Sequence, residues 1–191
     1  MPVSTVDIVN TALDFIGQGN ITSMEEASPL AEKARRLWPL CLDEVLRAHF
    51  WKCAASRAKL NEMGGSPAFG FARAFTLPGD FVRLIEAAPK DAVVKVEGRA
   101  LLTDEKSISI LYVRRLEDTT LYDATLRLCL ALKLAAMMAF GASSSTALAQ
   151  DMEAKYRDKL REARTYDSME GPGQEMPQQS TWADAKMGRR L

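Results

Sequence analysis

The sequence predicts an α+β fold, a bundle of about four helices with a small antiparallel β insertion between the second and third helices and an extended C-terminal tail. Apolar residues recur at helical intervals before Leu60 and again after residue 118. Between these regions, apolar and polar residues alternate between Gly- and Pro-containing turns, as in short strands. The expected boundaries are 1–60 and 118–167 for the helical bundle, 61–117 for the β-rich insertion and 168–191 for the arm.

Two helix starts are marked in the first region. Ser4 and Asp7 have the spacing of a capping box with Asp in place of Glu, and Gly17 supplies the stop. Ser28 before Pro29 combines a good cap with a residue that has no N–H to leave unpaired. One apolar face is expected on the second helix, at Leu30, Ala34, Leu37, Trp38, Cys41 and Val45.

The β-rich region contains two turn signals. Leu77-Pro78-Gly79-Asp80 reads as a turn between strands, and Gly98 supplies the positive φ of a hairpin between Val94 and Leu101. Asn61 to Pro67 reads as a loop. Ile108, Ile110 and Tyr112 then form one face of a further strand.

The last region predicts two more helices. Residues 126–140 are apolar on nearly every face, so this helix is expected at the centre of the core; Arg127 and Lys133 interrupt it, and it is too short to span a membrane. The final helix has one apolar face, at Ala149, Met152, Tyr156, Leu160 and Ala163.

Composition excludes several classes of protein. Twenty-five basic residues balance 25 acidic ones, which argues against a chain that mainly binds nucleic acid, although a local basic face stays open. The three cysteines are far apart and without CxxC spacing, so neither a disulfide framework nor a zinc site is indicated. The N-terminus has no basic segment followed by an apolar run, so no secretory signal is expected.

No catalytic, metal-binding or cofactor-binding constellation is expected. His49 and Cys53 have helical i,i+4 spacing, and a thiol hydrolase using Cys53 is an alternative, but such a pair also needs a pocket and an oxyanion donor. The acidic pairs in predicted loops read as solvated caps and turns, namely Glu25-Glu26, Asp104-Glu105 and Glu117-Asp118. Phe50 and Trp51, among the cations of residues 47–59, could stack on a single strand, but they favour a helix end anchored in the core.

Two motifs carry a resemblance to a known family. LRAHFWKCAASRAKL (residues 46–60) resembles the LRAHPWNFA-type segment of the tail tubular protein A family, the head-to-tail adaptors of short-tailed bacteriophages. Residues 74–84 are similar to the family's AYxLPxDxxRL motif, and residues 12–28 and 108–115 match its weaker ALxxIG…IxSxxExS and IxIxYxxR patterns. The resemblance runs from about Ser4 to Met138. The residues that carry its two strong motifs are His49, Phe50, Trp51, Arg57, Leu77, Pro78, Asp80 and Arg83.

The resemblance implies a structural virion protein, made in the host cytoplasm and located at the head–tail junction. It implies a ring of twelve copies that joins the portal protein to the tail nozzle or tube, with DNA passing through the lumen without tight binding. No cofactor, membrane or enzyme activity is implied. Phe50 stands where the family usually has Pro, and Lys52-Cys53 replaces Asn-Phe, so the local turn is expected to differ.

The arm 168–191 lies beyond the resemblance. Its composition cannot form a core, so we expect it to dock on the portal or a neighbouring subunit through Trp182, Arg189 and Arg190. The alternative function is a DNA-binding packaging or head-completion protein. Whether the isolated chain is monomeric stays open at this stage.

Overall fold

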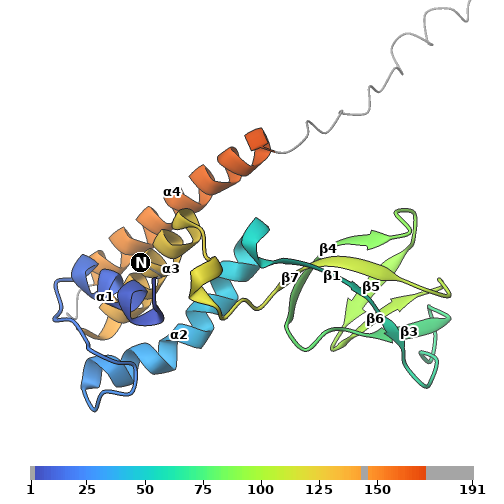
Figure 1. Cartoon of the computed structure of the whole chain (residues 1–191), viewed down its shortest axis with the longest axis horizontal. Coiled ribbons are helices and arrows are strands. Elements are labelled where there is room, and N and C mark those ends of the chain that lie inside the picture. The colour runs from blue at the N-terminus through green and yellow to red at the C-terminus, as the bar shows by residue number, and fades with distance from the viewer. Residues whose placement is uncertain (1–2, 143–145, 171–191) are drawn as a thin grey trace, which may run out of the picture.

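The computed structural model describes residues 3–142 and 146–170. The helices are α1 (Thr5–Phe15), α2 (Pro29–Ala48), α3 (Ala124–Ala142) and α4 (Thr146–Glu170), with 3₁₀ turns η1 (Lys52–Ala54) and η2 (Thr119–Leu121). The strands are β1 (Ala55–Lys59), β2 (Asn61–Glu62), β3 (Arg73–Thr76), β4 (Phe81–Ala88), β5 (Val94–Glu97), β6 (Ala100–Thr103) and β7 (Ser109–Arg114). Helices gather at one end of the molecule and strands at the other (Figure 1).

The prediction of a helical bundle carrying only a small β insertion is wrong. The described residues do contain four helices, but their strands form two antiparallel sheets, one of three strands and one of four. The strand orders are β1-β7-β4 and β2-β3-β6-β5. The molecule is therefore an α+β protein whose β part consists of two sheets.

The residues of β1 show one reason why the sequence analysis underestimated the β part. Its residues carry no large apolar side chain, because Ser56, Arg57, Ala58 and Lys59 occupy most of it, so hydrophobic alternation cannot reveal it. Tertiary pairing decides instead: β1 runs antiparallel to β7 from Ala55↔Val113 to Lys59↔Ser109. The segment predicted as a loop from Asn61 also begins with a short strand, β2, which is exposed throughout and pairs with β3.

Helix starts follow the predicted chemistry. Ser4 accepts a hydrogen bond from the backbone N–H of Asp7, and the Asp7 carboxylate accepts one from the N–H of Ser4 at 2.7 Å, which completes the capping box. Ser28 caps α2 with Pro29 at its first turn. The helix runs unbroken through Pro39 to Ala48.

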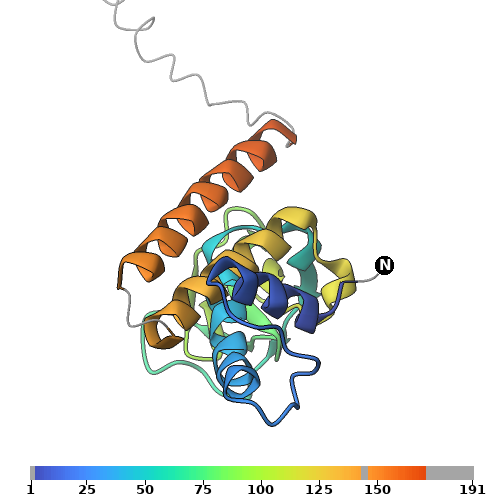
Figure 2. The same cartoon turned by 90° about the vertical axis from the view of Figure 1, so that its left-hand side faces the viewer.

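Helix α3 is central, as predicted. It contacts α1, α2 and α4, and Leu126, Leu130, Leu134 and Met138 along it are fully buried. Helix α4 lies on the outer side of α3 (Figure 2). All five residues of the predicted apolar face of α4 are buried.

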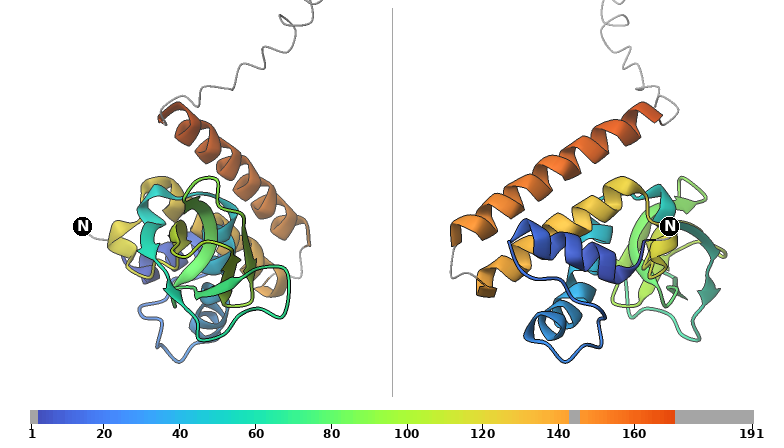
Figure 3. Two further views of the ribbon diagram at one scale, coloured as in Figure 1. Left: turned by 90° about the vertical axis from the view of Figure 1, so that its right-hand side faces the viewer. Right: turned by 60° about the vertical axis from the view of Figure 1, so that its left-hand side comes forward.

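A second, smaller core lies within the β part. It is built by Leu60, Phe75, Leu77, Leu101, Ile108, Ile110 and Tyr112. Val113 packs instead into the helical core, so β7 contributes to both cores. The hairpin between β5 and β6 has the predicted turn, with Gly98 at φ 58°. The two sheets face each other across this core at the end of the molecule away from α1 (Figure 3).

Strand β1 lies within the stretch 1–60 assigned to the helices, and α4 continues to Glu170. Most of the arm, residues 171–191, lies outside the described residues. The division into helical, β-rich and arm segments therefore stays a prediction.

Candidate functional site

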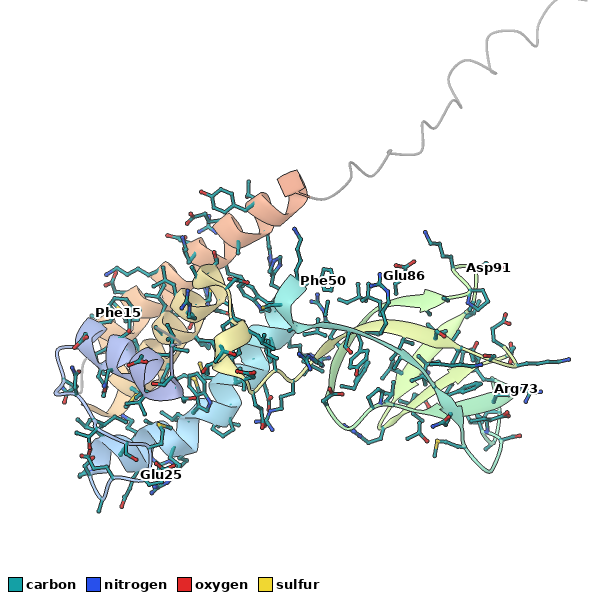
Figure 4. The ribbon with its side chains drawn as sticks, viewed as in Figure 1. Phe15, Glu25, Phe50, Arg73, Glu86 and Asp91 are labelled. Carbon is teal, nitrogen blue, oxygen red and sulfur yellow. The ribbon has the colours of Figure 1, made fainter. Side chains whose placement is uncertain are left out.

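The two sequence motifs meet at the C-terminal end of α2. The Arg47 guanidinium donates to the carbonyl of Val82 on β4 at 3.0 Å, and the Arg83 guanidinium donates to the carbonyl of Arg47 at 2.9 Å. Residues that lie 36 positions apart in sequence thus form a reciprocal link between the helical part and the three-stranded sheet. Figure 4 labels Phe50 at this junction.

Side chains cap the C-terminal end of α2. His49 is extended (φ −141°, ψ 159°), so no left-handed residue at its C-cap position caps the helix. The Trp51 indole N–H donates to the Val45 carbonyl at 2.8 Å, and Arg164 of α4 donates to the Ala48 carbonyl at 2.9 Å. Together with Arg83, these donors satisfy three of the last carbonyls, and the two cations among them, Arg83 and Arg164, suit the negative end of the helix dipole.

The aromatic residues of the motif anchor this helix end. Trp51 is 2% exposed and meets the ring of His49 edge-on, with ring centroids 4.8 Å apart. Phe50 is half-buried and packs against the same helical core. The segment therefore joins helix to sheet through a buried indole while Arg47 and Lys52 remain exposed.

The Pro78 motif ties the two sheets together. Arg99, beside the β5–β6 hairpin, donates to the carbonyls of Pro78 and Gly79 at 2.8 and 3.2 Å. Leu77 is buried, and its N–H donates to the Arg99 carbonyl at 3.1 Å. The Asp80 carboxylate accepts a hydrogen bond from the Tyr112 hydroxyl at 3.0 Å. Arg99 and Tyr112 thus hold the turn at Pro78–Asp80 in place. Arg83, in the same motif, connects the turn's strand to α2.

Arg57 lies apart from this junction network. It is exposed on β1 opposite Leu111, and it borders an open hollow of about 390 Å³ with Lys59 and Glu86. Trp182, Arg189 and Arg190, the expected docking residues of the arm, lie outside the described residues.

The structure does not assemble a Cys–His pair. Helix α2 ends before His49, so the helical spacing to Cys53 is lost. The Cys53 thiol lies 3.6 Å from the carboxylate of Asp123, and burial raises the pKa of the thiol. A raised pKa keeps the thiol protonated, which is unsuited to a nucleophile. Burial also raises the pKa of Cys41 and Cys129 to about 12.

The acidic pairs act in turns and caps. Hydrogen bonds from Ser23 and Thr22 lower the pKa of Glu25 and Glu26, respectively. Hydrogen bonds from Thr120 lower the pKa of Asp118, which caps η2. Within residues 3–142 and 146–170, no group of three or more His, Cys, Asp and Glu is placed to hold a metal ion.

Three tertiary contacts have no clear signal in the sequence. Arg164 and Arg99 reach carbonyls on distant elements, and nothing in their local pattern indicates this. Lys133 is 8% exposed and joins three helices through Glu44 of α2 and Glu153 of α4. A lone lysine in an apolar helix was the available signal, because a buried charge requires partners.

None of the helices, as far as the chain is described, offers an apolar stretch that could cross a membrane. No protein-family model matches the sequence, and the comparison with curated proteins gives no match either.

Proposed function

We propose that this chain is a structural subunit of a head-to-tail adaptor ring in a short-tailed bacteriophage. In this role about twelve copies sit between the portal and the tail nozzle or tube and continue the DNA channel without gripping the DNA. The subunit is made in the host cytoplasm and ends in the virion. The role is structural and involves no catalysis or cofactor.

The observation that carries the proposal is the convergence of the two motifs. Residues 46–60 and 74–84 carry the strong part of the resemblance to the tail tubular protein A family, and in space they share one hydrogen-bonded junction through Arg47 and Arg83. The junction joins α2 to β4 by two hydrogen bonds, so both motifs contribute to the contact between the helices and the three-stranded sheet.

Exposed apolar side chains support an assembly role. Phe69 is 88% exposed on the loop between β2 and β3, beside a hollow of about 630 Å³ that Met63 and Phe71 also line. Leu40 on α2 is 58% exposed. Apolar side chains gathered at a loop tip are typical of contact surfaces.

The alternative is a DNA-binding packaging or head-completion protein. The observation in its favour is the group of three arginines at the end of α2, namely Arg47, Arg83 and Arg164. Tight binding to duplex DNA at physiological salt would favour this alternative, since specific DNA-binding proteins reach nanomolar affinity or better.

The test is reconstitution with the portal ring encoded by the same phage genome. Native mass spectrometry and electron microscopy of the mixture should show a ring of this chain on the portal with rotational symmetry. A Phe69→Ser variant tests whether the β tip faces a partner, and Leu40→Ser tests the side of α2. A mixture that yields no complex, or only a two-fold dimer of this chain, contradicts the adaptor function.

A further inference from the structure

Strand β5 is an open edge of the four-stranded sheet. The strand order β2-β3-β6-β5 gives it a single strand neighbour among the described residues, which is β6. The two strands pair in regular register, without a bulge, and β5 contains no proline. Three of the four residues of β5 are exposed. Bulges, prolines and covering elements are the usual protection of such an edge, so β5 keeps a backbone edge that can pair with another strand.

The register shows which backbone groups of β5 point outward. A two-residue turn joins β5 to β6, so Glu97 and Ala100 on its two sides form a hydrogen-bonded pair. Hydrogen-bonded and non-hydrogen-bonded pairs alternate along an antiparallel ladder. The N–H and C=O groups of Lys95 therefore also face β6, and those of Val94 and Val96 face away from it.

The side chains of β5 alternate between the two faces of the sheet. Lys95 and Glu97 share the outer face, where they form an ion pair at 2.6 Å and line the same hollow as Phe69. Val94 packs against the smaller core, and Val96 on the same face is 39% exposed. One face of this edge thus carries two opposite charges two residues apart, and the other carries an incompletely buried apolar side chain.

This pattern is complementary to itself about a two-fold axis. When two copies of β5 run antiparallel with Val96 opposite Val96 of the second copy, Lys95 of each copy lies opposite Glu97 of the other. The two Val96 residues exchange N–H···O=C hydrogen bonds, and the non-hydrogen-bonded pairs beside them bring the charged side chains close together. Opposite charges at directly facing positions stabilise a pair of strands.

Charge and geometry disfavour the other self-pairings. The neighbouring register of β5 that keeps outward groups facing each other places Lys95 opposite Lys95, and like charges there are destabilising. In the other sheet, the edge strand β1 carries Arg57 and Lys59 on one face, so self-pairing again opposes like charges. The edge strand β4 is interrupted by register shifts, and Arg47 occupies the carbonyl of Val82. Strand β5 is therefore the edge suited to pairing with its own copy.

We propose that two copies of this chain associate through β5, which pairs with β5 of the second copy about a two-fold axis at Val96 and joins the two four-stranded sheets into one. Lys95 and Glu97 of both copies then form a group of four alternating charges, and the exposed part of Val96 is covered. The proposal concerns the free chain and goes beyond the adaptor function, on which it does not depend. Because the contact is short, the dimer is in equilibrium with the monomer.

Charge reversal in the full chain tests this pairing. Sedimentation equilibrium should show a monomer–dimer equilibrium for the wild type. Lys95→Glu alone, or Glu97→Lys alone, opposes like charges twice in the dimer and should weaken association at least about tenfold. An equimolar mixture of these two variants should recover most of the wild-type affinity, because each Glu then faces a Lys. Lys59→Glu reverses an exposed charge on a strand of the other sheet and should leave association unchanged.

A proline separates pairing of the outer edge from folding of the hairpin. Val96→Pro removes an N–H group that points away from β6, so the β5–β6 hydrogen bonds stay while the outer edge loses a donor. This variant should keep the circular dichroism spectrum of the wild type and sediment as a monomer.

Several results would overturn the proposal. They are a wild type that is monomeric at every concentration, single reversals that associate like the wild type, a mixture of the two reversals that recovers nothing, or a folded Val96→Pro variant that still dimerises. Its failure is distinguishable from that of the adaptor function. A free chain that stays monomeric but forms a ring on the portal contradicts only the β5 dimer, and a β5 dimer that ignores the portal contradicts only the adaptor function.

Discussion

The ammonium group of Lys133 on α3 lies 2.7 Å from the carboxylate of Glu44 on α2, inside the helical part of the molecule. Glu153 of α4 completes the group at 3.1 Å, and the Lys133 ammonium lies 5.3 Å from the centroid of the Tyr156 ring. Burial lowers the pKa of Lys133, but the hydrogen bonds that its ammonium group donates to Glu44 and Glu153 outweigh this effect, and the net pKa is raised. One lysine thereby joins three helices.

Lys133→Met should destabilise the protein by about 1–3 kcal/mol, because the two carboxylates lose a charged hydrogen-bond partner. Met keeps the apolar stem, so the loss reports the charge. Urea unfolding followed by circular dichroism measures it. Adding Glu44→Gln and Glu153→Gln should restore part of the stability, since no uncompensated carboxylate is then left. A triple variant less stable than Lys133→Met would contradict this account.

Arg83→Ala should cost about 1–2 kcal/mol, because the Arg47 carbonyl loses a charged donor at the negative end of α2. Arg57→Ala is the matched control, since Arg57 is exposed on β1, and it should change stability by less than about 0.5 kcal/mol. Chemical denaturation measures the free energy of unfolding of both variants and so tests the prediction. Equal losses would show that Arg83 does not hold the junction.

Trp51→Phe should lower stability by about 1–3 kcal/mol, because it leaves the Val45 carbonyl without its indole donor in a buried site. Trp51→Ala should cost about 3–5 kcal/mol, since it also opens a cavity. Trp38→Phe is the control, as Trp38 is only half-buried. Thermal unfolding compares the three. If the Trp51→Phe variant is as stable as the wild type, the indole hydrogen bond contributes nothing to stability.

Gly98→Ala should cost about 1 kcal/mol, because φ 58° disfavours a side chain. No heavy atom lies within 4 Å of the added Cβ, so the cost reports backbone conformation alone. Gly79→Ala is equally uncrowded and has no positive φ, so it should be nearly neutral. Gly98→Asn should lose less than Gly98→Ala, since Asn tolerates this conformation. Denaturation midpoints that are the same for the Gly98→Ala and Gly79→Ala variants would refute the argument.

Stability should fall at alkaline pH. The thiols of Cys41 and Cys129 ionise near pH 9.0 when unfolded, but burial raises their pKa to about 12 in the folded chain. Their contribution is fully present below pH 9.0 and is lost as the pH rises toward 12, because the unfolded chain binds fewer protons there.

Cys41→Ala/Cys129→Ala should therefore flatten the decline of the thermal midpoint above pH 9.0, even if packing losses lower the midpoint at neutral pH. Tyr122 and Tyr156, whose pKa values burial also raises, should leave a residual decline at higher pH. Double-variant and wild-type midpoints that fall in parallel would contradict the assignment.

Local chemistry made part of the fold predictable. The Ser4–Asp7 box, the Ser28–Pro29 start and the Gly98 turn depend on residues within a few positions of one another. The buried face of α4 follows from its period alone. These features need no knowledge of distant partners.

Long-range placement made the rest unpredictable. Strand β1 is defined by pairing with β7, and no apolar pattern marks it. The bond from Arg164 to the Ala48 carbonyl joins residues 116 positions apart, and an exposed arginine on a helix does not reveal such a contact. The motif residues were recognisable, but their meeting through Arg47 and Arg83 required the tertiary structure.

The pairing of Ala55 with Val113 places the first and last strands of the β part side by side. The stretch from Ala55 to Arg114 therefore leaves the helical part and returns to it at adjacent positions. Segments with adjacent ends can be inserted, exchanged or shortened without rerouting the chain around them. A change of length within the β part therefore leaves the positions of its two ends, and hence its connection to the helices, unaltered.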